Sequence, residues 1–211
     1  MEDEGCGIKF AGFTVYYPCS YDGEYNATMV ALTGTCSAYM ELVDRSNEVS
    51  ALIDNGKLRE AATLLRYILD RKPAAGFDNV SLALTQHELG TVLRQLGELD
   101  NALELLMQAF VVRDHADENL GIVIALRDGN LTREEIAKVY EAKGNCAKAL
   151  DVRQRGKRIC SNDVCEALDY KDDELFACSR CKCVFYCGKT CQRQDWKNRH
   201  RPMCQQPMRQ I

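Results

Sequence analysis

Four close pairs of potential metal ligands occupy the C-terminal quarter of the chain, and they constrain its fold more than any other feature. The eight residues are Cys160, Cys165, Cys178, Cys181, Cys187, Cys191, His200 and Cys204. Because each pair is separated by two to four residues, one tight turn can present both side chains to the same ion. Eight ligands are enough for two tetrahedral zinc sites, one with four cysteines and one with three cysteines and a histidine.

Disulfide bonds are the alternative use of such cysteines, and they persist in oxidising compartments. The chain begins MEDEGCGIKF, which lacks the basic, apolar and small-residue segments of a secretory signal. Its longest apolar run, residues 120–126 with one glycine inside, is far too short to span a bilayer. The sequence therefore favours zinc over disulfides, and it predicts a soluble intracellular protein, cytoplasmic and/or nuclear, without a membrane segment.

The residues around the ligands match a known pattern. Cys178-Ser-Arg-Cys181, Tyr186-Cys187, Cys191-Gln192 and Trp196 resemble a MYND-type zinc finger in both spacing and residue type. In that family the ligand pairs interleave as a cross-brace. The resemblance therefore implies two Zn²⁺ ions, the first bound by Cys160, Cys165, Cys187 and Cys191, and the second by Cys178, Cys181, His200 and Cys204.

Two details depart from the commonest MYND pattern. Four residues separate the first ligand pair where two are usual, and three residues separate Trp196 from His200 where two are usual. Neither departure removes a ligand, so both concern the local shape of a loop or turn.

The segments between the ligands predict a short strand and a helix. Cys183 is left over once eight ligand positions are filled, and we expect an unliganded thiol there. The β-branched and aromatic residues Val184–Tyr186 suit a strand. Residues 189–199 read as a helix that Pro202 halts.

Internal repeats occupy the middle of the chain. Three segments share a glycine followed five residues later by an alanine, at Gly56/Ala61, Gly97/Ala102 and Gly144/Ala149. With the apolar residues around them they resemble tetratricopeptide repeats, in which a glycine makes the turn between two packed helices. Successive glycines are 41 and 47 residues apart, which exceeds the usual repeat of about 34 and resembles the spacing in kinesin light chains. We expect a mainly α-helical fold.

The third repeat has local peculiarities. Arg153 and Gly156 stand where the pattern has a large apolar residue and an alanine. Thr132-Arg-Glu-Glu135 reads as a capping box that opens the first helix of this repeat. Residues 1–41 show no sustained helical period. The predicted organisation is a leader of unknown structure at 1–41, TPR-like helical repeats at 42–158, a MYND-type finger with a β-hairpin and a helix at 159–206, and a tail at 207–211.

The uneven distribution of charge raises a nucleic-acid hypothesis. The chain has a formal charge of −4, but residues 178–211 hold eight Lys or Arg and one acidic residue, Asp195. A basic end favours nucleic-acid binding. Seven thiolates and two zinc ions together carry −3, however, and this offsets much of the basic charge. A nucleic-acid-associated regulatory zinc-finger protein is therefore the alternative function.

Catalysis finds little support in the sequence. MYND fingers also accompany SET-type lysine methyltransferases and iron-dependent prolyl hydroxylases, but the repeats and the finger leave no room for either domain. His115 and Asp117 echo part of an iron-binding triad. The other histidines are His87, in a predicted repeat helix, and His200, a predicted zinc ligand. We expect no enzymatic activity and no small-molecule substrate.

Both resemblances imply recognition of proteins. Tetratricopeptide arrays offer a concave helical surface to peptides or partner helices. MYND fingers bind short proline-containing peptides along their hairpin strand, here Val184–Tyr186. The contact positions of the family correspond to Ser179, Gln192 and Trp196 in this chain, although Trp196 also suits a role in closing the small core of the finger. The sequence thus predicts a non-catalytic protein–protein interaction adaptor.

Overall fold

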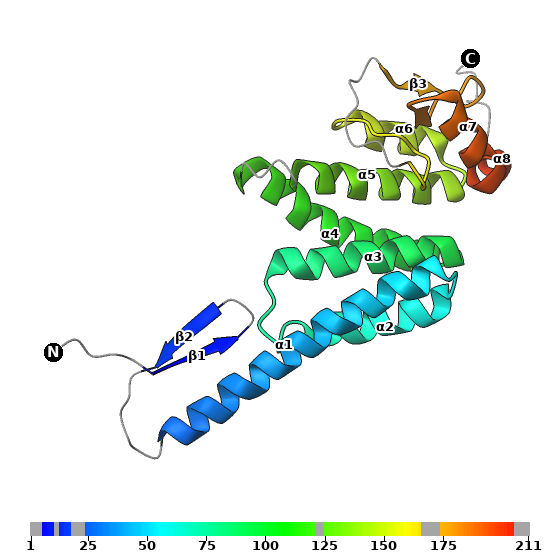
Figure 1. Cartoon of the computed structure of the whole chain (residues 1–211). Coiled ribbons are helices and arrows are strands. Elements are labelled where there is room, and N and C mark those ends of the chain that lie inside the picture. The colour runs from blue at the N-terminus through cyan, green and yellow to red at the C-terminus, as the bar shows by residue number, and fades with distance from the viewer. Residues whose placement is uncertain (1–5, 11–12, 18–23, 121–124, 166–173, 205–211) are drawn as a thin grey trace.

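The computed structural model describes residues 6–10, 13–17, 24–120, 125–165 and 174–204, with side chains described at 36–114, 129–165 and 174–204. A hairpin of β1 (Cys6–Phe10) and β2 (Phe13–Tyr17) precedes the long helix α1 (Glu24–Asp54) (Figure 1). The two strands pair antiparallel, with Cys6 opposite Tyr17. Helix α1 runs through residue 42, the predicted boundary between leader and repeats.

Three helical hairpins form the body of the molecule. Helix α1 packs on α2 (Leu58–Arg71), α3 (Asn79–Leu96) on α4 (Leu99–Leu120), and α5 (Ala125–Ala142) on α6 (Cys146–Gln154). Contacts between α2 and α3 and between α4 and α5 join consecutive hairpins into one stack (Figure 1). The structure therefore confirms the predicted mainly α-helical fold.

The repeat glycines make the turns inside these hairpins. Gly56, Gly97 and Gly144 have φ angles of 70°, 84° and 76°, in the left-handed region that glycine enters without a steric penalty. At the end of α3, the Gly97 N–H donates to the Arg94 carbonyl, and the next amide donates to the Leu93 carbonyl. This pattern ends the helix and reverses the chain, as the sequence predicts.

The core of the array combines small and large apolar residues. The alanine of each repeat, at positions 61, 102 and 149, is fully buried. A Cβ atom added at Gly90 would lie 2.6 Å from Leu106 Cγ, so α3 and α4 approach more closely there than a side chain on α3 would allow. Leu65, Ile68, Leu89, Leu93 and Leu106 fill the remaining space. Burying each such side chain stabilises the fold by about 1.5–3 kcal/mol.

The capping box predicted at Thr132 is wrong. Helix α5 begins at Ala125, so Thr132 lies about two turns inside it. The Thr132 side chain is buried and its Oγ1 lies 3.1 Å from His87 Nδ1, while Glu135 pairs with Arg94 and Lys138. The local pattern assigns Thr132 and Glu135 to a helix start, but both side chains instead contact residues of α3.

The finger follows α6 and packs beside it (Figure 1). Strand β3 (Phe176–Ala177) pairs antiparallel with β4 (Phe185–Tyr186), and α7 (Lys189–Asp195) follows. A π-helical turn, η2 (Trp196–His200), then leads into α8 (Arg201–Met203). The helical path thus continues past the predicted end, with Pro202 in the first turn of α8, where proline is tolerated.

The π turn accounts for one departure from the MYND pattern. The Arg201 N–H donates to the Trp196 carbonyl five residues earlier. A π turn contains one residue more than an α turn. The extra residue between Trp196 and His200 is therefore accommodated inside the helix.

Candidate metal centre

Eight ligand residues converge on two points of the finger. The first tetrad contains Cys160, Cys165, Cys187 and Cys191; the second contains Cys178, Cys181, His200 and Cys204. Within each tetrad the candidate ligand atoms all lie within 4.8 Å of one another. The structure thus groups these residues as the interleaved cross-brace implies, since each tetrad joins segments that are far apart in the sequence.

The spacing of the ligand atoms fits zinc. Ligands at about 2.3 Å from a tetrahedral ion lie roughly 3.8 Å apart. The Sγ–Sγ distances are 3.7 Å for Cys165–Cys187, 3.5 Å for Cys187–Cys191 and 3.9 Å for Cys178–Cys204. The cysteines whose side chains the structure describes are all free thiols. Sulfur and imidazole donors without a carboxylate are the ligand set that structural zinc prefers.

Without a bound ion, two of the ligand thiols are held in their neutral form. Burial raises the pKa of Cys160 well above its usual value and that of Cys204 to about 12. Buried thiols of this kind become thiolates when a bound metal ion compensates their charge.

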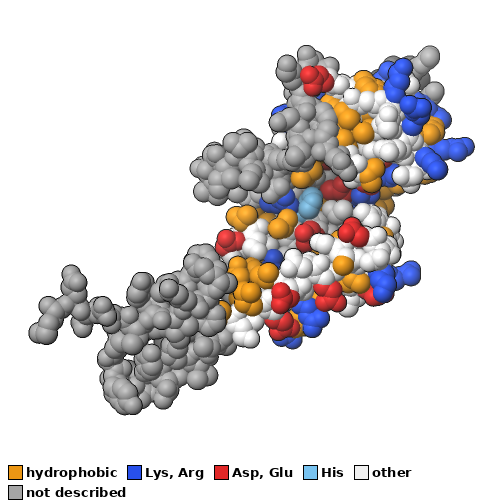
Figure 2. Space-filling view, in the orientation of Figure 1, with side chains coloured by type: hydrophobic (Ala, Val, Ile, Leu, Met, Phe, Trp, Pro, Cys, Tyr) orange, Lys and Arg blue, Asp and Glu red, His pale blue; other side chains and the backbone are white. Residues whose placement is uncertain are grey.

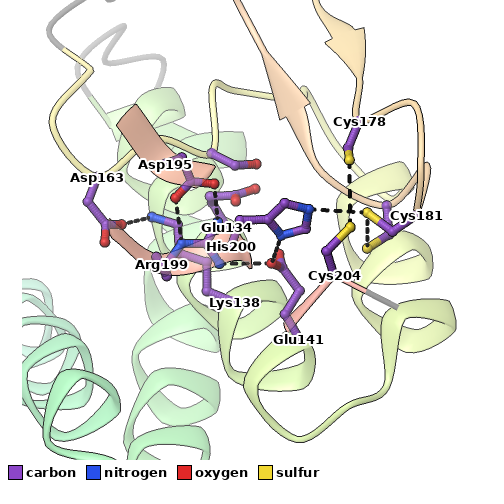
Figure 3. Close-up of polar contacts among 12 residues, drawn as sticks. Glu134, Lys138, Glu141, Asp163, Cys178, Cys181, Asp195, Arg199, His200 and Cys204 are labelled. Carbon is purple, nitrogen blue, oxygen red and sulfur yellow. Dashed lines mark hydrogen bonds and ion pairs between the residues drawn. The ribbon is translucent and has the colours of Figure 1, made fainter. Parts of the chain in front are cut away.

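His200 connects the second tetrad to a set of buried polar groups (Figure 3). Its Nε2 lies 3.4 Å from Cys181 Sγ, and its Nδ1 lies 3.4 Å from Glu141 Oε2, a contact whose geometry falls short of a hydrogen bond. The rings of Trp196 and Tyr186 meet the imidazole edge-on, at centroid distances of 5.8 and 6.4 Å. The imidazole is therefore held by aromatic contacts and a carboxylate.

An ionic network beneath His200 joins the finger to α5 and α6. Arg199 forms two hydrogen bonds of 2.8 Å to Asp195 and one of 2.8 Å to Glu141. The Tyr186 hydroxyl also donates to Asp195, at 2.7 Å. Burial opposes ionisation of Glu141, but Arg153 and Arg199 outweigh it and hold its pKa well below the usual range. The network therefore pairs each of its buried carboxylates with a guanidinium group.

Arg153 explains why the third repeat departs from its pattern. Its guanidinium is buried, donates to both carboxylate oxygens of Glu134, and also donates to Glu141 and to the Cys183 carbonyl. The Arg153 side chain thus ties α6 to α5 and to the finger. The sequence marks this residue as unusual, but nothing in its local pattern identifies the partners.

A second ionic cluster joins α3 and α5 to the loop of the first ligand pair. Arg94 and Lys138 both pair with Glu135 and with Asp163, which lies between Cys160 and Cys165. The Arg94–Glu135 contact is 2.7 Å and both side chains are largely buried. Sequence reasoning missed this cluster, because its members are scattered over two repeats and a loop.

A polar cavity of about 200 Å³ lies between the array and the finger. Figure 2 shows this hollow, with a histidine and charged side chains on its walls. His87, Thr91 and Gln95 line it from α3. Burial, reinforced by the charge of Arg113, lowers the pKa of His87 to about 4, so this ring is neutral near pH 7.

The three candidate peptide contacts occupy two places on the finger. Ser179 is exposed, two residues after β3. Gln192 and Trp196 are half-buried and lie one helical turn apart, and the backbone N–H of Trp196 donates to the backbone carbonyl of Gln192. Within the described residues, no hydrogen bond joins Ser179 to this turn.

Strand β4, the predicted peptide strand, is covered. Val184, Phe185 and Tyr186 are all buried. The outward-facing carbonyl of Phe185 accepts a 2.8 Å hydrogen bond from the Ser161 amide, and the Phe185 amide donates to the Ser161 hydroxyl at 3.4 Å. The chain itself therefore occupies this edge at Phe185.

Two further groups singled out in the sequence are Cys183 and the pair His115 and Asp117. Cys183 is buried outside both tetrads, with its Sγ 3.6 Å from Cys181 Sγ, and its hydrogen bond lowers the pKa of Cys181 to about 3. The side chains of His115 and Asp117 lie outside the described residues.

Comparisons with known proteins agree with the geometry of the finger. Residues 160–204 match the family model described as MYND finger. The F-box protein At1g67340 of Arabidopsis thaliana is 41% identical over 49 residues, which are 23% of this chain and 13% of that protein. The chain therefore matches only a small part of that relative's length.

Among solved structures, a putative kinesin light chain from Podosopora anserina with nearly identical TPR-like repeats is similar over 56% of this chain and 74% of that chain. The identity is 17% and the TM-score 0.31. The family match and the two tetrads together lead to one conclusion: residues 160–204 are a MYND zinc finger, whose cofactor is a pair of zinc ions.

Proposed function

We propose that this chain is a non-catalytic adaptor that binds short proline-containing peptides through its finger and protein partners through its helical array. The proposed units are the TPR-like array at 42–158 and the finger at 159–206, with the two tetrads as zinc ligands. The observation that carries the proposal is the turn bearing Gln192 and Trp196. An indole that is half-buried against His200 offers an aromatic wall beside an amide, which suits contact with a proline ring.

The outer edge of β3 carries no backbone hydrogen bond from the described part of the chain, so it is the better place for an added strand. The Cys178 amide donates to the Val184 carbonyl, so the alternation of an antiparallel pair turns the Ala177 N–H outward. Phe176 is 37% exposed and its ring lies 6.1 Å from Tyr186. We therefore place the peptide along Phe176–Ala177 and next to Ser179, instead of along Val184–Tyr186.

Intrinsic fluorescence tests the peptide proposal directly, because Trp196 is the only tryptophan of the chain. Peptides with a central proline should shift its emission in a saturable way, while the same peptides with alanine should bind more weakly. Gln192→Ala should reduce the affinity, and Lys189→Ala, an exposed change on the same helix, should not. Equal responses to proline and alanine peptides would refute proline recognition.

The strand position has its own test. Ala177→Pro removes an outward N–H without touching the Cys178–Val184 hydrogen bond, so peptide binding should weaken while zinc content stays at two equivalents. Unchanged affinity in this variant would exclude strand addition at β3.

Nucleic-acid binding is the second candidate, and one observation favours it. Six basic side chains of the finger are exposed: Arg180, Lys182, Arg193, Lys189, Lys197 and Arg201. Figure 2 shows Lys and Arg side chains gathered on the outer side of the finger. A mobility-shift assay with duplex and single-stranded DNA at two salt concentrations decides: measurable binding that falls steeply with salt would establish it.

The compartment follows from the zinc chemistry within this proposal. Thiolate ligands persist where thiols stay reduced, so we place the protein in the cytoplasm, the nucleus or both. Among the described helices, none combines the length and the apolar composition that crossing a membrane requires.

A further inference from the structure

Glu141 is a residue of the helical array whose carboxylate reaches the metal centre. It lies near the end of α5 and is 1% exposed. Its Oε1 accepts a hydrogen bond from Arg153 of α6, and its Oε2 accepts one of 2.8 Å from Arg199 of η2. Because these two guanidinium groups hold it from different elements, the carboxylate has a fixed position (Figure 3).

This fixed carboxylate faces the second nitrogen of a candidate zinc ligand. His200 is fully buried, and its Nδ1 lies 3.4 Å from Glu141 Oε2. The opposite nitrogen, Nε2, lies 3.4 Å from Cys181 Sγ within the second tetrad. The imidazole therefore spans the distance between the carboxylate of the array and the thiolates of the finger.

Metal-binding histidines commonly direct their other ring nitrogen to a carboxylate, which fixes the orientation of the ring. We propose that Glu141 is the positioning residue of the second zinc site, so that a residue of the helical array sets how tightly the finger holds this ion. The inference depends on the two-zinc assignment, and it goes beyond the proposed adaptor function because it makes zinc retention a property of the array and the finger together.

Zinc release from the full-length chain tests the proposal. Wild type and Glu141→Gln are titrated with a competing chelator, and the two zinc equivalents are followed separately. In the variant, the affinity for one equivalent should fall about 10–100-fold, while the affinity for the other stays unchanged. Substitution with Co²⁺ identifies the affected site, because the visible spectrum of a site with three cysteines and a histidine differs from that of a site with four cysteines.

Glu134→Gln is the matched control for a general loss of buried charge. Glu134 lies on the same helix, is also buried, and pairs with Arg153 through both of its oxygens. It makes no hydrogen bond or ion pair with His200 in the described structure. The control should leave both zinc affinities near the wild-type values, and a loss equal to that of Glu141→Gln would overturn the proposal.

A double-mutant cycle separates the direct effect of Glu141 on zinc affinity from any effect of the substitution on the stability of the fold. His200→Cys supplies a fourth thiolate, which has no second nitrogen for Glu141 to hold. Any destabilisation caused by Glu141→Gln alone is common to both backgrounds and cancels in the cycle. The proposal expects Glu141→Gln to leave zinc affinity unchanged in the His200→Cys background. An equal loss in both backgrounds, or loss of both zinc equivalents together, would overturn it.

Discussion

Replacing Arg153 by leucine would give the third repeat the large apolar residue that its pattern predicts, at a position where the protein has a buried cation. Arg153 is 2% exposed. The substitution leaves Glu141 with Arg199, but the described hydrogen bonds of the Glu134 carboxylate both come from Arg153. The Cys183 carbonyl also loses its donor. A buried carboxylate is thus left without its partner, although the new side chain is apolar.

The expected cost of Arg153→Leu is about 3–5 kcal/mol of unfolding free energy, the usual effect of removing one partner from a buried ion pair. At about 2–4 °C per kcal/mol for a chain of this size, the melting temperature should fall by roughly 6–20 °C. Differential scanning calorimetry in zinc-saturating buffer measures it. Arg155→Leu is the control: Arg155 pairs with Asp151 but its side chain is 72% exposed, so its effect should stay within about 0.5 kcal/mol. A loss below about 1 kcal/mol for Arg153→Leu would refute the reasoning.

Three further outcomes are expected. Removing zinc by chelation should abolish amide exchange protection in the finger while helices α1–α4 keep theirs, because bound metal supplies much of the folding free energy of so small a module; protection that survives in the finger would contradict this. His87 has a pKa of about 4 in the fold and about 6.5 when unfolded, so its contribution to stability is complete above pH 6.5 and is lost as the pH falls towards 4. Wild type should therefore lose about 2 kcal/mol more than His87→Gln between pH 7.5 and pH 5 in urea titrations, and parallel losses would contradict the assigned pKa. Gly90→Ala should cost about 1–3 kcal/mol through contact with Leu106, and in a double-mutant cycle Leu106→Ala should remove most of that cost; additive effects would show that the helices do not meet there.

The candidate zinc ligands could be picked out from the sequence because their signal is local. Each pair, such as Cys178 and Cys181, presents two ligands from one turn, so spacing alone restricts the chemistry. The glycine turns at Gly56, Gly97 and Gly144 were equally predictable, since the required backbone angles leave little choice of residue. Which pairs share an ion is not local information, and only the family resemblance implied it.

The ionic networks could not be predicted, because their members meet only in the folded chain. Glu141 and Arg199 are 58 residues apart and Arg94 and Asp163 are 69 apart. In the sequence alone, such charged residues look like part of the solvent-exposed face of an ordinary helix. Tertiary contacts also override a local signal at Thr132, where a capping pattern lies inside a helix.

The covered edge of β4 could not be predicted either, because it also depends on a tertiary contact. Val184–Tyr186 has the composition of a strand, and the structure confirms one at Phe185–Tyr186. Composition does not reveal that Ser161 occupies its outer edge. That contact depends on the path of the chain between α6 and the first ligand pair.

The shared ionic network limits how far the finger can be treated as a portable unit. A fragment cut near residue 159 keeps both tetrads but leaves Arg199 without Glu141, and Asp163 without Arg94 and Lys138. A graft onto another scaffold would have to supply a carboxylate at the position of Glu141, or replace Arg199 and Asp195 by neutral groups of similar shape. Adding α5 and α6 to the fragment restores Glu141 and Lys138, but the Arg94 partner of Asp163 lies on α3, so the finger keeps all of these ion pairs only together with the helices from α3 onward.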